Sequence, residues 1–257
     1  MSVPDIRICF IGDSFTAGVG DPETLGWVGR VAAAALAEGH NLTAYNLGVR
    51  RETSADILRR WQQECAPRAL SGVDTRIVFS FGANDTAFDN GRRRLTLEQS
   101  LACARQMLRA AREKYPVLLI GPPPVADAAH DERIAGLSRA LAGIAREQEV
   151  PFLDVFTPLM ASPRWRLEAG ANDGSHPRAG GYRELAALVM NWRDWWFHRP
   201  AAATPRPEPA EHTIRIAESD DDIAACLPVM AQLRPHLAPH DFVARIRRQI
   251  AEGYRLA

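Results

Sequence analysis

Residues 6–20 read Ile-Arg-Ile-Cys-Phe-Ile-Gly-Asp-Ser-Phe-Thr-Ala-Gly-Val-Gly, and the organisation of the chain follows from this segment. Its first half is short, apolar and rich in β-branched residues, which predicts a buried strand that Gly12 ends. Asp13 and Ser14 come next, at the strand end where a parallel α/β sheet binds its ligands. A serine there can act as a nucleophile. The alternative is that these two residues only cap the following helix, since both residue types are preferred N-caps.

Strand and helix patterns alternate from this segment as far as residue 197. We predict strands at about 6–11, 42–47, 76–81, 117–120 and 152–155, and helices at about 25–37, 54–65, 96–114, 131–147 and 177–197. The predicted strands are apolar on both faces, which is typical of a parallel sheet covered by helices on each side. The sequence therefore predicts an α/β fold with three α/β/α layers around a doubly wound, five-stranded parallel sheet.

Composition excludes some classes of function and predicts a compartment. The chain of 257 residues has 31 Lys and Arg against 31 Asp and Glu, so its formal net charge is zero. No global field then favours nucleic acid or an anionic membrane, and we expect no nucleic acid as a partner. The four cysteines form no CxxC pair, which favours core thiols in a reducing compartment. We find no signal segment and no apolar run of the ~20 residues that a membrane span needs, and we expect a cytoplasmic protein.

Candidate catalytic residues follow three of the predicted strands and therefore meet at one edge of the sheet. An acyl-transfer site needs a nucleophile, a base, a group that orients the base, and donors for the oxyanion. Ser14 is the candidate nucleophile. Its own N–H, the N–H of Gly48 and the side-chain amide of Asn84 are the three candidate oxyanion donors.

The candidate base is His176, in the sequence Asp173-Gly-Ser-His-Pro. Pro177 disfavours helical geometry at His176 and suits the first position of the next helix, so we expect the histidine on a loop. Asp173 and His176 span a four-residue turn, so the carboxylate can accept from one imidazole nitrogen and leave the other for the serine. The pair could instead ligate a metal, but no third ligand forms a recognisable cluster with it. We expect no metal and no cofactor.

These residues fall in four sequence blocks. In chain order the blocks are Gly12-Asp13-Ser14-Phe15-Thr16, Asn46-Leu47-Gly48, Gly82-Ala83-Asn84-Asp85 and Asp173-Gly-Ser-His176. They resemble the four blocks of the GDSL, or SGNH, hydrolase family, over about residues 5–197. The resemblance implies a flavodoxin-like fold and hydrolysis of esters or thioesters without a metal. Arg51 stands where many relatives carry glycine, which leaves the expected chemistry unchanged but weakens inference about the substrate.

The leading hypothesis is a serine esterase that forms an acyl-enzyme at Ser14 and acts on a small-molecule acyl ester. Small acyl esters, O-acetylated sugars, lysophospholipids and acyl thioesters remain open as substrates, and the sequence does not indicate an oligomeric state. The alternative from another class is a non-catalytic, flavodoxin-like binding domain. That class would need phosphate-binding loops at the strand ends, and no GxGxxG opens a helix after the first strand.

The chain beyond the hydrolase-like part carries a second pattern. We predict a domain at 1–198, a Pro- and Ala-rich linker at 199–212, and a small α+β fragment at 213–257. The fragment reads as a strand at 213–217, helices at 222–233 and 241–252, and a further strand beginning near Gly253. This order resembles the opening of a GNAT-type N-acetyltransferase domain, and the alternative is an ordinary helical appendage. The resemblance implies the esterase half of a bifunctional enzyme whose second domain is truncated, and we expect this chain not to bind acetyl-CoA.

Overall fold

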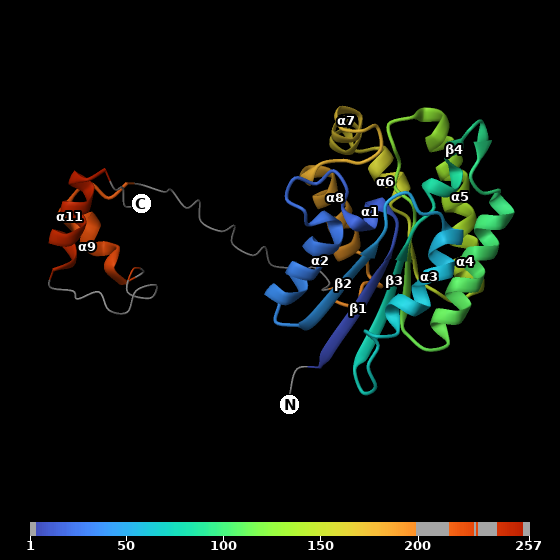
Figure 1. Cartoon of the computed structure of the whole chain (residues 1–257), viewed down its shortest axis with the longest axis horizontal. Coiled ribbons are helices and arrows are strands. Elements are labelled where there is room, and N and C mark those ends of the chain that lie inside the picture. Colours follow the sequence, from blue (N-terminus) through green and yellow to red (C-terminus); the bar gives the residue numbers. More distant parts are fainter. Residues whose placement is uncertain (1–3, 199–215, 229, 231–240, 254–257) are drawn as a thin grey trace. The chain divides into compact units, whose positions relative to one another are not determined.

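A computed structural model of the chain describes residues 4–198, 216–228, 230 and 241–253. The chain forms two compact units, Met1–Pro200 and Ala201–Ala257. The larger unit contains a parallel sheet of five strands in the order β2-β1-β3-β6-β7 (Figure 1). The strands are β1 (Asp5–Gly12), β2 (Asn41–Gly48), β3 (Asp74–Ser80), β6 (Val117–Ile120) and β7 (Phe152–Leu153). The predicted fold class and all five predicted strands are thus confirmed, with ends that differ by one or two residues.

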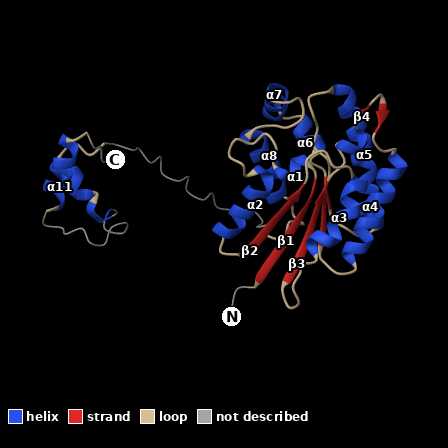
Figure 2. Cartoon of the chain, in the orientation of Figure 1, coloured by secondary structure: helices blue, strands red, loops and turns tan. Residues whose placement is uncertain are grey.

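Helices cover both faces of the sheet and make three layers (Figure 2). One face packs against α2 (Gly26–Ala37) and α8 (Ala179–Met190), and the other against α3 (Ser54–Cys65), α4 (Leu97–Arg112) and α5 (Ala128–Glu147). Strand β1, which has a neighbour on each side, supplies both cores, because successive side chains point to opposite faces. Ile8 and Phe10 enter the first core, and Cys9 and Ile11 enter the second.

Helix starts follow the capping chemistry of the sequence. Thr96 and Gln99 form a capping box at the start of α4. At α3 the N-cap is Thr53, which pairs with Asp56 in a second capping box, and the helix spans the predicted residues 54–65. Ser54 becomes the first helical residue, and its side chain is free for another contact described below.

Several short elements were not predicted from the sequence. They are α1 (Ser14–Ala17), the 3₁₀ turn η1 (Asn84–Thr86), the hairpin strands β4 (Phe88–Asp89) and β5 (Arg92–Arg93), α6 (Phe156–Met160) and α7 (Pro163–Ala171). Each is too short for apolar periodicity to reveal it, and local contacts define it instead: Ser162 caps α7, and Pro163 occupies its first turn. The prediction of helix as far as Phe197 was also wrong, since α8 ends at Met190 and buried Trp195 follows in a turn.

The smaller unit, considered alone, contains α9 (Asp220–Ala225) and α11 (Phe242–Ala251). Ile223 of α9 is buried with Phe242 and Ile246 of α11, and Arg247 bonds Asp220 at 2.7 Å. The second predicted helix of this segment is therefore present. The first begins earlier than predicted, at Asp220; α9 ends at Ala225, residues 227, 228 and 230 are again helical, and 231–233 lie outside the described residues. Residues 216 and 217 are not in a strand. The rest of the strand predicted at 213–217, the linker at 199–212 and residues 254–257 lie outside the described residues.

Close packing at the carboxyl ends of β1 and β2 explains one glycine. In β2, Gly48 lies directly beside Gly12 of β1 in the parallel register. A Cβ atom at Gly48 would lie 2.2 Å from the backbone nitrogen of Ala17 and 2.8 Å from the carbonyl oxygen of Asp13. Both atoms belong to backbone that cannot rotate away, so a larger residue must push α1 off the strand end.

We predict that Gly48→Ala destabilises the domain by about 1–3 kcal/mol, the usual cost of forcing extra atoms into a packed site. Urea denaturation of the purified variant measures this. Gly143→Ala is the matched control, because its added Cβ meets nothing within 4 Å and lies inside α5. Alanine is the better helix former by about 1 kcal/mol, so this control should be neutral or stabilising. Equal stability of the two variants would contradict the packing argument.

Candidate active site

Ser14 is held at the start of α1 by the residue before it. The Asp13 side chain accepts a hydrogen bond from the Phe15 N–H at 3.0 Å and so caps the short helix. Ser14 thereby becomes the first helical residue, just past the end of β1, with 4% of its surface exposed. The Ser14 N–H has no acceptor among the described residues. The alternative that Ser14 is itself a helix cap is wrong, because Asp13 has that role.

The structure brings His176 and Asp173 to Ser14 in one line of hydrogen bonds. His176 Nε2 lies 2.7 Å from Ser14 Oγ, although the two residues are 162 positions apart. The other ring nitrogen, Nδ1, lies 2.7 Å from Asp173 Oδ2. His176 is buried and Asp173 is exposed at the mouth of the site. This is the relative placement of nucleophile, base and orienting carboxylate that acyl-transfer chemistry requires.

The turn from Asp173 to His176 fixes both the charge of the acid and the tautomer of the base. Partial burial acts to raise the pKa of Asp173, but hydrogen bonds from the His176 N–H, the His176 ring and the Ser175 N–H lower this pKa to about 2. An ionised carboxylate can only accept. In the uncharged imidazole Nδ1 therefore carries the proton, and Nε2 is left to accept from the Ser14 hydroxyl.

Aromatic packing and backbone contacts hold the His176 loop in place. The Phe15 ring lies 4.8 Å from the His176 ring, and its own partner is Trp165 of α7, at 6.2 Å between centroids. Asn172 Nδ2 donates to the His176 carbonyl at 3.0 Å. The Ala126 N–H donates to the Gly174 carbonyl at 2.8 Å, which ties the loop to the segment after β6. Helix α7 is thus part of the support of the base, which the sequence pattern did not reveal.

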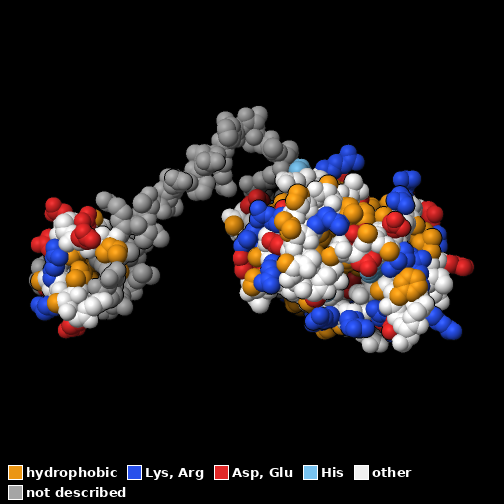
Figure 3. All heavy atoms as spheres, turned by 90° about the horizontal axis from the view of Figure 1, so that it is seen from above, with side chains coloured by type: hydrophobic (Ala, Val, Ile, Leu, Met, Phe, Trp, Pro, Cys, Tyr) orange, Lys and Arg blue, Asp and Glu red, His pale blue; other side chains and the backbone are white. Residues whose placement is uncertain are grey.

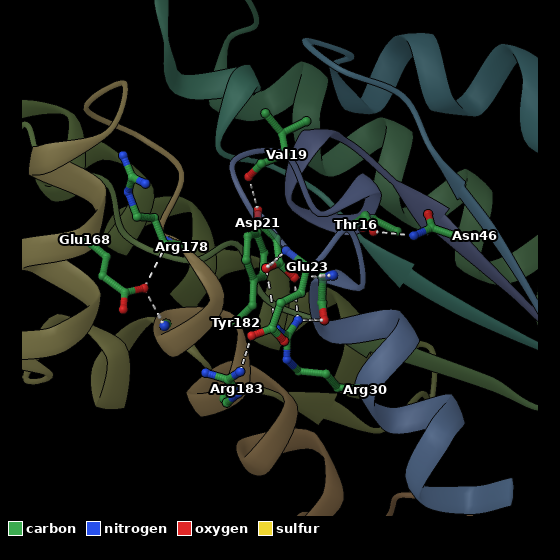
Figure 4. Close-up of polar contacts among 12 residues, drawn as sticks. Thr16, Val19, Asp21, Glu23, Arg30, Asn46, Glu168, Arg178, Tyr182 and Arg183 are labelled. Atoms are coloured by element: carbon green, nitrogen blue, oxygen red, sulfur yellow. Dashed lines mark hydrogen bonds and ion pairs between the residues drawn. The ribbon is translucent and has the colours of Figure 1, made fainter. Parts of the chain in front are cut away.

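A polar network joins the loop after α1 to α8 (Figure 4). Asp21 accepts from the Gly26 N–H at 2.8 Å and from Arg30 at 2.5 Å at the start of α2. Arg30 also bonds Glu23 at 2.9 Å, and Glu23 in turn contacts Arg183 of α8. The Tyr182 hydroxyl, also on α8, donates to the Val19 carbonyl at 2.8 Å. The loop that follows α1, the helix of Ser14, and the helix that follows His176 are therefore fixed to each other.

The amide of Asn84 faces the same edge, and its orientation is set by two acceptors. Asn84 Nδ2 donates to the Glu52 carbonyl at 3.0 Å and lies 3.4 Å from Asp13 Oδ2. Both neighbours accept hydrogen bonds, so the amide must present its NH₂ group to them rather than its oxygen. Both N–H bonds of the amide thus have an acceptor here, and an oxyanion that uses Asn84 must replace Asp13 Oδ2, the more distant of the two.

Buried side chains anchor the 3₁₀ turn that carries Asn84. Asp85 is fully buried and accepts from the Ser54 N–H at 2.7 Å and from the Ser54 hydroxyl at 2.5 Å. His130 of α5 places Nε2 3.0 Å from the Ala83 carbonyl and 3.0 Å from Thr86 Oγ1. Burial raises the pKa of Asp85 and lowers that of His130. Sequence reasoning assigned neither residue a supporting role, because each acts on a distant element.

The Gly48 N–H is at the expected edge but has a partner in this structure. It donates to Asn46 Oδ1 at 3.1 Å, while Asn46 Nδ2 donates to the Thr16 carbonyl at 2.8 Å. Asn46 thus links the end of β2 to α1. An oxyanion that uses the Gly48 N–H must share it with this side chain or replace it.

Other candidate sites are absent from the part of the chain that the structure describes. No three His, Cys, Asp or Glu side chains gather there as a metal site would need. No described helix is long and apolar enough to cross a membrane. A surface groove of about 500 Å³ lies along α5, β7 and α6 and shares no residue with the site around Ser14.

Comparison with known proteins identifies the family. The model of the GDSL-like lipase/acylhydrolase family matches residues 10–184, which include all five candidate site residues. The chain belongs to the GDSL-like lipase/acylhydrolase family. It is therefore a hydrolase of ester bonds, as the sequence blocks implied. The family match ends before the smaller unit, so the resemblance of that unit to an acetyltransferase stays a prediction.

Relatives of this hydrolase include proteins described as esterases. Esterase TesA of Pseudomonas aeruginosa is 26% identical over 179 residues, which cover 70% of this chain and 83% of TesA. The crystal structure of the lipase/acylhydrolase from Enterococcus faecalis matches with a TM-score of 0.60 and 26% identity, covering 71% of this chain and 92% of that one. The uncharacterized protein YpmR of Bacillus subtilis is 33% identical over 82 residues, and the match spans only 32% of YpmR.

The buried carboxyl of Asp13 predicts a specific pH dependence of stability. Burial, together with the nearby carboxyls of Asp85 and Glu52, raises the pKa of Asp13 to about 7, against the effect of the Phe15 N–H. In the unfolded chain this group ionises near 3.8. Between pH 3.8 and about 7 the folded state keeps a proton on Asp13 that the unfolded state releases. The free energy of unfolding therefore decreases as the pH rises through this range.

Asp13→Asn removes that group and should gain stability relative to the wild type between pH 5 and 8, by on the order of 1–3 kcal/mol. Urea denaturation at each pH measures the difference. Thr16→Val, a neighbouring buried substitution without an ionisable group, should keep the wild-type pH dependence. If the free energy of unfolding varied with pH in the same way for wild type and Asp13→Asn, Asp13 would have the same pKa in the folded and unfolded states, and the prediction would be wrong.

Proposed function

We propose that the protein is a serine esterase that hydrolyses carboxylic esters through an acyl-enzyme at Ser14. The observation that carries the proposal is the continuous hydrogen-bonded line from Ser14 Oγ through His176 to Asp173, with 2.7 Å at each step. A non-catalytic binding domain has no need of a serine hydroxyl aligned with an imidazole. The names of the relatives, esterase and lipase/acylhydrolase, support the same chemistry.

In the first half-reaction Ser14 Oγ attacks the carbonyl carbon of the ester while His176 Nε2 takes the hydroxyl proton. The ionised Asp173 stabilises the imidazolium that forms. When the tetrahedral intermediate collapses, the bond to the alcohol oxygen breaks and His176 returns the proton to the departing alcohol. Water then attacks the acyl-serine, with His176 as base again, and releases the carboxylic acid and free Ser14.

The oxyanion is stabilised by donors from three elements. The Ser14 N–H has no acceptor among the described residues. Asn84 of η1 donates one N–H to the Glu52 carbonyl, and its other N–H turns to the oxyanion in place of Asp13 Oδ2. The Gly48 N–H is the third donor, once the oxyanion replaces Asn46 Oδ1 as its acceptor. Such fixed donors act more strongly in the transition state than on the ground-state carbonyl, and so they lower the barrier to reaction.

Ser14→Ala should reduce hydrolysis of 4-nitrophenyl acetate by at least about 10³-fold, because no other nucleophile replaces the hydroxyl. A fluorophosphonate probe should add its mass to the wild type at Ser14 and not to the variant. The matched control is Ser138→Ala, a buried serine on α5 outside the site, which should keep both properties. Unchanged hydrolysis by a folded Ser14→Ala protein would exclude the proposed mechanism.

Asn84→Ala should lower kcat by about 10²–10³-fold with little change in KM, as expected for a donor that acts mainly in the transition state. Steady-state kinetics with the same ester separate the two constants. Asn191→Ala, at the end of α8, is the control for loss of an asparagine elsewhere. A rise in KM alone would make Asn84 a substrate-binding residue instead.

A further inference from the structure

The segment from Val49 to Glu52 forms one wall of the site, between the acid Asp173 and the amide Asn84. At one end, Arg50 places its guanidinium 3.6 Å from Asp173 Oδ2. At the other, the Glu52 carbonyl accepts the hydrogen bond from Asn84 Nδ2 at 3.0 Å. Two adjacent arginines, Arg50 and Arg51, therefore stand between the parts of the site that handle the proton and the oxyanion.

The backbone of this wall is rigid. The Val49 N–H donates to the Gly12 carbonyl at 3.0 Å, and Arg94 donates to the Arg51 carbonyl at 2.7 Å. Arg51 itself has φ of +70°, in the left-handed region that residues with a Cβ atom rarely adopt. Such backbone persists where the surrounding structure enforces it, and it gathers at functional sites. The two arginine side chains thus start from fixed positions.

Their charges are available to a ligand. The Arg50 side chain is 62% exposed, and Arg51 is exposed with no paired carboxylate among the described residues. Asp173 does not need Arg50, because its carboxylate already accepts three hydrogen bonds from its own turn. An exposed ion pair at 3.6 Å contributes little to stability, so the position of Arg50 is not explained by folding. Figure 3 views the domain from above, the side on which this edge of the sheet lies.

The position of Arg50 also indicates which half of the substrate it meets. His176 Nε2 must deliver a proton to the oxygen of the departing alcohol, so that oxygen lies beside His176. Arg50 lies on the same side, next to the carboxylate that orients His176. The acyl carbonyl instead faces Asn84 and the N–H of Ser14.

Resting on the proposed function, we propose that Arg50 and Arg51 form a subsite for an anionic group on the leaving alcohol. The preferred substrates are then acyl esters whose alcohol carries a carboxylate or a phosphate. Both anions match the guanidinium groups in charge and geometry. The site uses this charge to select among esters, while the hydrolytic steps stay the same.

The test compares kcat/KM for 4-acetoxybenzoate, whose leaving alcohol is anionic, with that for its neutral methyl ester. The ratio of the two constants is measured for wild type, Arg50→Gln, Arg51→Gln and the double variant. Any effect of Arg50 on Asp173 alters both esters and cancels in the ratio. We expect the ratio to fall by about 3–10-fold in the double variant, since each exposed pair contributes modestly. A second pair with phosphate in place of carboxylate shows which anion the subsite prefers.

Controls make each outcome decisive. Arg109→Gln, on α4 with a side chain 78% exposed, should keep the wild-type ratio. Replacing both arginines by lysine should retain most of the wild-type ratio. Raising the salt from about 50 to 500 mM should lower the ratio in wild type and in the lysine variant, but not in the double glutamine variant. A wild-type ratio in the folded double variant, with both anions, would overturn the subsite. Hydrolysis of both esters by Ser14→Ala would instead overturn the proposed function, so the two failures are distinguishable.

Discussion

The parallel register of β1 between β2 and β3 is the constraint on which the site depends. Gly12 pairs with Gly48 on one side and with Ser80 on the other, so three strands end at the same level. Segments that follow these ends must then meet, although they are far apart in the sequence. Burial of β1 on both faces holds the register, because a slip by one residue would exchange the side chains of its two cores. The hydrophobic pattern of one strand therefore positions polar groups that it never contacts.

The elements that the sequence could predict are those that leave a periodic or compositional signal. The five strands and the main helices have such signals, and Ser14, Gly48, Asn84, Asp173 and His176 follow strands or precede a helix in recognisable blocks. For Ser14, Gly48 and Asn84, the meeting at one edge follows from the parallel topology of β1, β2 and β3. The supporting contacts could not be predicted, because they join elements without sequence proximity: Trp165 of α7 stacks on Phe15, and His130 of α5 holds the turn of Asn84. A partner fixed by tertiary packing has no local pattern to reveal it.

Two buried carboxyl groups hold the residues beside them at the carboxyl ends of the strands. Asp13 and Asp85 are buried carboxyls, which burial alone disfavours in their charged form. Each accepts hydrogen bonds from backbone N–H groups of a helix start, Asp13 from Phe15 and Asp85 from Ser54. These bonds offset part of the cost of removing the carboxyls from water. The result is that Ser14 and Asn84, each next to one of these aspartates, have little freedom to move before a substrate arrives.

The two halves of the site are supported in different ways, and this separates their functions. The proposed oxyanion donors depend on strand ends and on turns held by the central sheet. Asp173 and His176 instead share one short turn, so the proposed base is oriented by a carboxylate of its own turn and needs only to face Ser14. The Phe15 ring and Asn172, which lie outside the sheet, hold His176 in this orientation. A change in α7 should therefore disturb proton transfer before it disturbs the oxyanion donors, although α7 contains none of the groups that react.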